Sequence, residues 1–318
     1  MDATERELFA TSLQGATERH TGEALDAALD ELGWADALAI DPHAAVSLLF
    51  ERQGAANVTS SALDRVVLDA LGLDGPATAL VLPPVGGCDP PGKGTAVRGL
   101  GGGHLARCEA AVVAFSGGDE DIVVVTVDAK DLTLRRVHGM DPALGLVEVS
   151  GSVDGTSRSG EISRTQNEWE AAIAAGQRAL AHELVGAARE MLRLASEHAV
   201  DRVQFGRPIG SFQAVRHRLA DTLVAIEAAD AALQTAWDDP SPVNAALAKA
   251  LAGRGALTAA RHCQQVLAGI GFTTEHPLHH HTRRARVLDQ LLGDARTLTH
   301  RLGADLVATQ TLPALLPL

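Results

Sequence analysis

The chain has 318 residues, of which 46% are hydrophobic, and it carries a formal net charge of −13 at pH 7. This length leaves room for two or three domains with a substantial core. The acidic balance argues against a nucleic-acid partner, because such a protein has little charge with which to neutralise phosphates. A local arginine cluster could still bind one small anion.

No run of the sequence approaches eighteen apolar residues, and the first residues show no signal-peptide pattern. Cys88, Cys108 and Cys263 are odd in number and widely spaced. They therefore predict neither a disulfide framework nor a zinc site. We expect a cytoplasmic protein without a membrane span.

Residues 1–82 predict a helical unit. Leu25, Leu29 and Leu32 recur at helical spacing, residues 44–52 form a second amphipathic piece, and residues 60–72 form a third that opens with serine and ends at glycine. The sequence pattern then changes from helical spacing to short runs of β-branched residues separated by Gly, Pro and Asp. These runs lie at residues 77–82, 110–115, 122–127, 132–137 and 146–149. They predict a compact β domain of five or more strands over residues 83–158.

Two glycine-rich stretches in the β domain imitate nucleotide-binding motifs. Residues 87–94 resemble a phosphate-binding loop but end in Gly94, where a serine or threonine would hold magnesium, and two prolines interrupt them. Residues 101–106 resemble a dinucleotide fingerprint but precede a strand rather than a helix. We interpret the second stretch as a hairpin loop and assign neither a function.

Residues 159–318 predict four long helical segments. The first covers residues 168–200, and the second has Phe212, Val215, Leu219, Leu223, Ile226, Leu233 and Trp237 at three- and four-residue steps. The third starts at Ser241 with proline next and ends before Gly269. The fourth carries a leucine-rich side and a possible interruption at Gly293. The pattern predicts an antiparallel four-helix bundle, and the whole chain is of the α+β class.

A tight corner, Asp201 to Gln213, joins the first two segments of the bundle. Gly206, Pro208 and Gly210 forbid a continuous helix, and Ser211 is the predicted N-cap of the next one. This stretch resembles the C-terminal domain of the acyl-CoA dehydrogenases. A second matching segment, Gln265 to Pro277, follows in the expected order. The resemblance covers roughly residues 160 to 305 and implies the three-domain fold of that family, here with a shortened N-terminal helical domain.

The resemblance implies a flavin adenine dinucleotide (FAD) shared across a subunit interface. Arg202 would contact the pyrophosphate, for which a guanidinium fork is well suited. Phe205 would pack beside the cofactor, Gln213 would hydrogen-bond to it, and residues 265–269 would form a second grip. The implied cofactor residues are Arg202, Gln204, Phe205, Gln213, Gln265, Val266, Ala268 and Gly269. Position 268 departs from the frequent glycine of relatives.

The catalytic residue of the family is absent. Relatives remove the α-proton of the acyl-CoA with a glutamate at one of two positions, and these fall on Gly176 and Leu292 here. Neither side chain can accept a proton. Glu168, Glu170 and Glu183 lie near the first position, but no family pattern supports them. The bundle has no Glu-x-x-His pair, and the adjacent His279, His280 and His281 are poor candidates for one metal ion, so we predict no metal.

The chain is therefore similar to the smaller, non-catalytic subunit of the α2β2 acyl-CoA dehydrogenases of actinobacteria, a type associated with steroid side-chain degradation. The resemblance implies a larger partner subunit that carries the glutamate and binds most of the acyl-CoA, and an electron-transfer acceptor. Two alternatives remain: a self-sufficient homo-oligomeric flavoenzyme with a relocated base, and a helical scaffold that has lost flavin.

Overall fold

The computed structural model describes residues 1–73, 78–117, 121–154 and 158–310. Its N-terminal unit is helical, as expected. The helices are α1 (Ala3–Arg19), α2 (Glu23–Glu31), α3 (Trp34–Ile40), α4 (Pro42–Ala56) and α5 (Ala62–Ala70). Leu25 and Leu29 of α2 are buried, whereas Leu32 follows the end of that helix and is half-buried. No helix in the described ranges is long and apolar enough to cross a membrane.

An eight-stranded sheet follows, in the order β6-β7-β3-β2-β4-β5-β8, with β1 paired parallel to β4. The strands are β1 (Thr78–Leu80), β2 (Gly92–Lys93), β3 (Ala96–Gly101), β4 (Ala110–Ser116), β5 (Asp121–Asp128), β6 (Leu132–Arg136), β7 (Val147–Ser152) and β8 (Arg158–Thr165). The sheet thus begins before and ends after the expected range of 83–158. The division at residues 82 and 158 stays a prediction.

The five β-branched runs predicted as strands all contain strands, but β2, β3 and β8 were missed. The stretch at residues 101–106 is not a hairpin loop. It contains the end of β3 and most of a 3-10 helix, Gly103–Arg107, that leads to β4, and β3 and β4 are separated in the sheet by β2. Residue 77, at the edge of one predicted run, lies outside the described residues.

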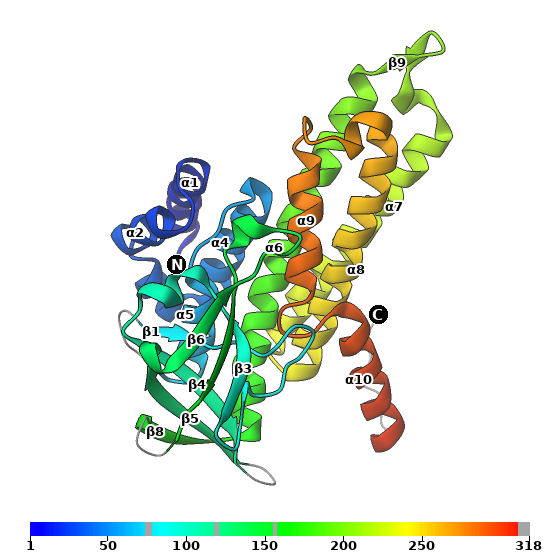
Figure 1. Cartoon of the computed structure of the whole chain (residues 1–318). Coiled ribbons are helices and arrows are strands. Elements are labelled where there is room, and N and C mark those ends of the chain that lie inside the picture. The colour runs from blue at the N-terminus through cyan, green and yellow to red at the C-terminus, as the bar shows by residue number, and fades with distance from the viewer. Residues whose placement is uncertain (74–77, 118–120, 155–157, 311–318) are drawn as a thin grey trace.

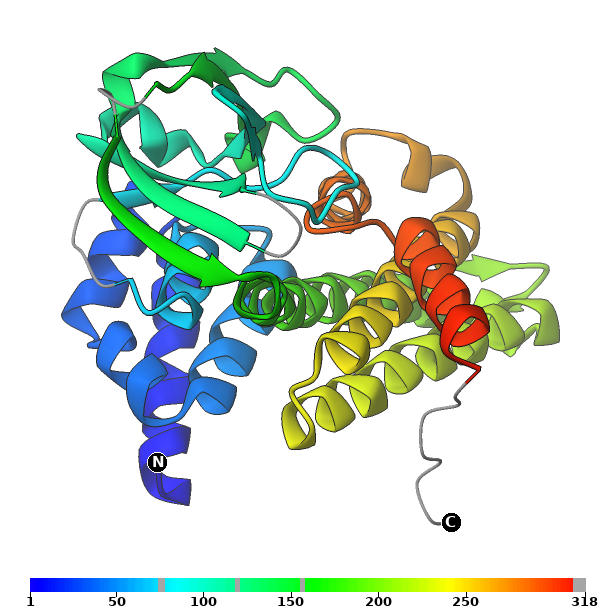
Figure 2. The same cartoon turned by 90° about the horizontal axis from the view of Figure 1, so that it is seen from below.

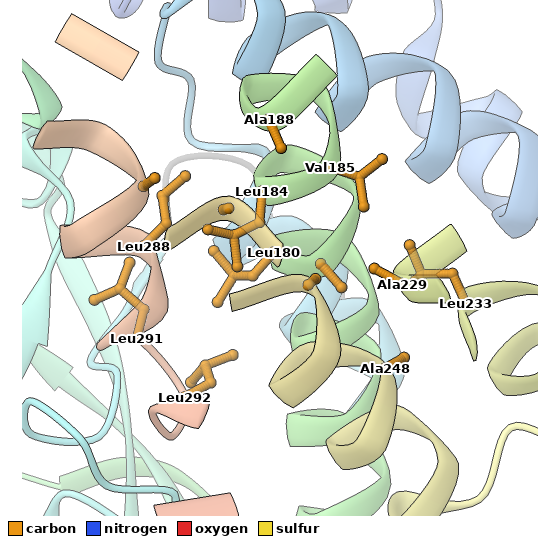
Figure 3. Close-up of a cluster of buried hydrophobic side chains, with 14 of the residues drawn as sticks. Leu180, Leu184, Val185, Ala188, Ala229, Leu233, Ala248, Leu288, Leu291 and Leu292 are labelled. Atoms are coloured by element: carbon orange, nitrogen blue, oxygen red, sulfur yellow. The ribbon is translucent and has the colours of Figure 1, made fainter. Parts of the chain in front are cut away.

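The C-terminal half is the expected helical bundle. It consists of α6 (Gln166–Asp201), α7 (Gln213–Asp238), α8 (Pro242–Leu267), α9 (Leu278–Asp289) and α10 (Ala295–Thr309), so the fourth predicted segment is two helices. Leu292 and Gly293 both have positive φ, 54° and 93°, which ends helical continuity at the predicted interruption. Leu180 and Leu184 of α6 lie between Leu288 of α9 and Leu233 of α7 (Figure 3).

Helix ends follow their caps in most places. Ser241 accepts a hydrogen bond from the Asn244 amide with proline at the first position of α8, as predicted. Ser211 was predicted to cap α7, and this is wrong: the N-cap is Phe212, and the Ser211 hydroxyl is buried without a partner. Leu223 was assigned to the buried face of α7 but is 47% exposed.

Helix α6 is the axis of the molecule. It packs against α4 and α5 on one side and against α7, α8 and α9 on the other, and it lies between the N-terminal helices and the bundle in the view from below (Figure 2). The crossing with α4 is a backbone contact. A Cβ atom on Gly186 would lie 2.0 Å from the Glu51 carbonyl oxygen, and one on Gly54 would lie 2.0 Å from that of Glu183. Both positions therefore require glycine.

We expect Gly186→Ala to lower the free energy of unfolding by about 2–3 kcal/mol, because the new methyl group forces two helix backbones apart. Thermal unfolding measures the loss. Gly303→Ala is the matched control: it lies in helix α10 with nothing within 4 Å of the added carbon. The control should leave stability unchanged or raise it by up to about 1 kcal/mol. Equal effects of the two substitutions would contradict the close crossing.

Candidate functional site

The corner between α6 and α7 is a two-stranded hairpin. Strand β9 (Val203–Gln204) pairs antiparallel with β10 (Arg207–Pro208). The two turn residues, Phe205 and Gly206, have φ of 52° and 76°, the left-handed values that tight two-residue hairpin turns need. Glycine adopts this conformation readily and phenylalanine does not. Phe205 therefore occupies the tip of this tight turn in a backbone conformation that costs it free energy.

The hairpin presents its predicted cofactor residues to solvent. Phe205 is 91% exposed, and Arg202, Gln204 and Gln213 are exposed too. The Arg202 guanidinium has no carboxylate partner within the described ranges. Its neighbour Arg207 lies with Cζ 4.2 Å from the ring centre of Phe212. The corner therefore offers the exposed Phe205 ring and the Arg202 guanidinium, a combination that suits a phosphate joined to an aromatic ring system.

The second predicted segment lies at the same end of the bundle (Figure 1). It is the end of α8 and the 3-10 helix Ala268–Phe272. Gln265, Ala268 and Gly269 are exposed, whereas Val266 is 5% exposed and belongs to the core. Nothing lies within 4 Å of a Cβ added to Gly269, so a ligand backbone or ring can approach closely there. Burial, together with the charges of His198 at the end of α6 and of His279, lowers the pKa of His276 in the second segment.

Large apolar side chains gather around both segments. Val200, Val203, Ile270 and Phe272 are exposed, Phe272 by 71%. Single exposed apolar residues are ordinary, but a group of them at one end of a bundle is typical of a surface that another molecule covers.

The two family base positions meet in space. A Cβ atom on Gly176 would lie 2.5 Å from Cδ1 of Leu292 and 2.9 Å from Cγ2 of Val67. Leu292 is 1% exposed. The Leu292 side chain therefore fills the apolar space beside Gly176.

Hydrogen bonds hold this turn in place. The Gln177 side chain donates to the Leu292 carbonyl oxygen at 2.9 Å, and the buried Lys249 ammonium donates to the carbonyl oxygens of Asp289 and Gly293 at 3.0 and 3.3 Å. Burial lowers the pKa of Lys249 to about 8. These contacts fix Leu292 against Gly176 despite its positive φ.

A small cavity lies near this contact. It lies between α5, α6 and α9, has a volume of about 60 Å³ and is lined by Leu63, Leu180, Leu288 and Leu291 among others. Sites that enclose small-molecule ligands measure roughly 300–1,000 Å³. The cavity holds a water molecule or two, and it does not hold an acyl chain in this conformation.

A buried ionic cluster lies at the edge of this cavity. The fully buried Arg284 guanidinium donates to Asp141, to the Val58 carbonyl oxygen at 2.8 Å and to Glu183 at 3.4 Å. Burial raises the pKa of Glu183 to about 7 although Arg284 opposes the shift. A pKa of about 7 suits a general base, so Glu183 is a candidate for that role. No family pattern in the sequence indicated this residue.

A second acid–base pair joins the N-terminal helices to the sheet. The Asp64 carboxylate accepts from the Leu80 amide at 2.9 Å and lies 3.0 Å from His104 Nε2. Burial alone would lower the pKa of His104, but the hydrogen bond to Asp64 and the negative charges of Asp64 and Asp26 together outweigh it and raise this pKa. No group of three or more metal-ligating side chains that could hold an ion occurs in the described ranges. The rings of His279 and His280 instead lie tilted against each other with their centres 3.8 Å apart, and His281 Nδ1 bonds to the Gly54 carbonyl oxygen.

A further cavity is one that the sequence did not indicate. It measures about 970 Å³ and lies between the sheet and α9, where Arg98, Arg135, Arg136 and Arg286 line it. Only the adjacent pair at 135–136 is visible as a charge cluster in the sequence. The other arginines come from β3 and α9, which are remote in the chain.

Comparison with known proteins identifies the class of protein. Residues 170–306 match the family described as acyl-CoA dehydrogenase, C-terminal domain. Acyl-CoA dehydrogenase IpdE2 of Mycobacterium tuberculosis is 46% identical over 126 residues, which are 40% of this chain and 40% of that protein. IpdE2 of Mycolicibacterium smegmatis is 40% identical over the same shares. The matches to these two relatives thus span about two fifths of their length.

Solved structures match the whole fold. The ChsE4-ChsE5 complex from Mycobacterium tuberculosis has a TM-score of 0.77 at 21% identity and covers 99% of both chains. The Tcur3481-Tcur3483 steroid ACAD variant has a TM-score of 0.75 at 23% identity and covers 96% of both. Butyryl-CoA dehydrogenase of Megasphaera elsdenii reaches 0.76 at 18% identity over 96% of this chain and 100% of that one.

Residues 170–306 are therefore an acyl-CoA dehydrogenase C-terminal domain, and the chain as a whole has the acyl-CoA dehydrogenase fold. The resemblance read from the two sequence segments is confirmed, and so is the α+β architecture. The roles of the individual site residues stay predictions.

Ala268 gives a test of local geometry. Its φ of 52° and ψ of −130° lie in a region that glycine adopts and other residues avoid. We expect Ala268→Gly to raise the free energy of unfolding by about 1 kcal/mol through relief of this strain. Ala231→Gly in the interior of α7 is the matched control and should lower it by about as much. A loss of stability in both variants would contradict the strained backbone.

Glu183 gives a test of burial. Because its folded pKa of about 7 lies above the ordinary value of 4.5, the folded state binds this proton more tightly. The resulting stabilisation is complete below about pH 4.5 and is lost as pH rises through 7. Relative to Glu183→Gln, wild-type stability should fall across this window, by at most about 1.4 kcal/mol per pH unit. Denaturant unfolding at several pH values measures the difference, and a flat difference would contradict the raised pKa.

Proposed function

We propose that this chain is the non-catalytic subunit of a heteromeric, FAD-dependent acyl-CoA dehydrogenase. It completes the flavin site of a larger partner subunit across an interface, in an α2β2 assembly, and the partner supplies the catalytic glutamate. The observation that carries this proposal concerns the two predicted base positions. They are occupied by Gly176 and Leu292, neither of which has a carboxylate, and the Leu292 side chain fills the space beside Gly176.

The open end of the bundle supports the cofactor part of the proposal. The residues there fit one half of a dinucleotide: Arg202 is an unpaired guanidinium for a phosphate, Phe205 is an exposed ring, and Gly269 leaves room for close approach. Bound FAD would supply the hydride acceptor. This chain's residues bind and orient the cofactor, and the surrounding exposed apolar side chains exclude water once a partner covers them.

The acyl-CoA substrate is assigned mainly to the partner, because neither base position carries a carboxylate here and Leu292 fills the space beside Gly176. Among the similar proteins, one solved structure is described as a steroid ACAD and another as a two-protein complex. These descriptions support a steroid side-chain thioester as the substrate class and a heteromer as the assembly. A cytoplasmic location and an external electron acceptor complete the proposal.

Glu183 supports the strongest alternative, a self-sufficient flavoenzyme with a relocated base. Its pKa of about 7 suits a general base. However, its carboxylate pairs with the fully buried Arg284 and borders a cavity too small for an acyl chain. Activity of the chain alone that disappears in Glu183→Gln would establish this alternative in place of our proposal.

The chain purified alone should show no acyl-CoA dehydrogenase activity, and neither Gly176→Glu nor Leu292→Glu should create it. The first variant places a side chain against Leu292 and Val67, and the second buries a carboxylate among apolar groups. Both should lose stability by several kcal/mol instead. Dye-coupled turnover with acyl-CoA thioesters is the measurement, and turnover in either partner-free variant would contradict the closed site.

Arg202→Ala should lower the flavin content of the complex while this subunit stays folded, because the side chain is exposed and pairs with no carboxylate in the part of the chain that the structure describes. A charge-assisted contact is worth roughly 1.5–3 kcal/mol, or about one to two decades of affinity. Arg202→Lys should recover part of the loss, and Gln265→Ala should act more weakly.

The matched control is Arg254→Ala, an exposed arginine on α8. Visible absorbance per complex measures flavin, and activity per bound flavin should stay constant. Full flavin content in Arg202→Ala would show that this residue does not hold the cofactor.

A further inference from the structure

Residues 268–277, most of the second predicted segment, lead from α8 to α9. Two hydrogen bonds hold the end of this stretch. The Leu278 amide, at the start of α9, donates to Nδ1 of His276 at 3.2 Å. His279 Nδ1, in the first turn of α9, donates to the carbonyl oxygen of His276 at 2.8 Å. His276 therefore joins the segment to α9 through both its side chain and its backbone.

The His276 imidazole acts as a cap of α9. The first amides of a helix have no partner within the helix, and Leu278 is the first residue of α9. The N-cap residue, Pro277, makes no side-chain hydrogen bond. The imidazole of the residue before it supplies the acceptor instead. Because Leu278 is fully buried in the main core cluster, this cap ties a mostly exposed segment to the core.

This cap requires a neutral imidazole. A backbone amide can only donate, so Nδ1 of His276 must carry a lone pair and the single ring proton is on Nε2. Protonation of the ring would place a second N–H on Nδ1 and turn two donors toward each other. The positive end of the α9 dipole also opposes an imidazolium at this position. The hydrogen bond therefore exists in only one of the two protonation states of His276.

The surroundings of His276 oppose its charged form as well. Burial lowers the pKa of His276, and the charges of His198 on α6 and His279 on α9 lower it further. Arg202, the predicted phosphate contact, is one of the charges that act on His198, and the neighbouring Glu275 is exposed. Because the pKa in the attached state lies below the ordinary value of 6.5, the attached state binds this proton less tightly. Attachment is thus strongest above pH 6.5 and weakens as the pH falls below it.

We propose that His276 is a positioning residue, whose neutral imidazole holds residues 268–277 on α9 and whose protonation releases them. The segment contains Ala268 and Gly269, which are predicted to contact the cofactor, so its release should weaken flavin binding. This consequence for the cofactor rests on the proposed function. The attachment itself does not, because its hydrogen bonds lie within one chain.

Hydrogen exchange of the full chain, corrected for the intrinsic effect of pH on exchange rates, tests the attachment. At about pH 8, His276→Ala should raise the exchange rates of the amides in residues 268–278 about fivefold, the usual effect of losing a helix cap. His276→Asn should restore protection, because its side-chain oxygen accepts the same hydrogen bond. Between about pH 8 and pH 5, protection should fall in the wild type. It should fall less in His276→Asn, which keeps His198 and His279.

His300→Asn is the matched control, since it removes an exposed histidine of α10 and should exchange like the wild type. Equal exchange in the wild type and His276→Ala would overturn the inference. Equal pH dependence in the wild type and His276→Asn would overturn it too.

Flavin content of the complex with the partner subunit separates this inference from the proposed function. His276→Ala should lower flavin affinity by up to about fivefold and His276→Asn should restore it, with activity per bound flavin unchanged. Normal exchange in His276→Ala beside a flavin-depleted Arg202→Ala complex would reject this inference and leave the proposed function standing. Faster exchange in His276→Ala, together with complexes that all lack flavin, would support the attachment and reject the proposed function.

Discussion

The crossing of α4 and α6 is the constraint on which the rest of the structure depends. Gly54 and Gly186 let the two backbones touch, with no space for even a methyl group at either position. This contact fixes the N-terminal helices on one side of α6, while α7, α8 and α9 pack on the other. Ion pairs reinforce it: Glu51 of α4 bonds to His182 and Arg189 of α6, and Arg189 reaches Asp230 of α7. Helix α6 can therefore act as a rigid axis for both ends of the molecule.

The two ends of that axis have opposite characters. Near its start, Gly176 accepts Leu292 and the space closes, with Gln177 and Lys249 holding the turn. At its far end the hairpin, the 3-10 helix after α8 and the exposed apolar side chains stay open. A subunit that has given up proton abstraction but keeps a cofactor contact would show this combination. Under the proposed function, the closed end corresponds to the lost base, and the open end is the surface that the partner subunit covers.

The sequence predicts much of this through local signals. Helix caps, the proline after Ser241 and the glycine at 293 mark element ends because they act on nearby backbone groups. Strand β8 escaped prediction because it is a polar edge strand, paired on one side only, without the β-branched alternation of β4 and β5. Ser211 failed as a cap because the hairpin and its following 3-10 turn delay the start of α7 to Gln213. The resemblance predicts both base positions from the sequence, but the contact between Gly176 and Leu292 joins positions 116 residues apart and becomes visible only in the fold.

The central claim is that this chain completes a cofactor site that lies mainly on another subunit. The most direct measurement compares the visible flavin absorbance and the mass of three purified samples: this chain, its candidate partner, and the two expressed together. The account predicts a colourless chain alone, and a complex of two copies of each that holds more flavin than the partner does by itself. Stoichiometric flavin in the chain alone, or a partner that holds its full flavin without this chain, would contradict it.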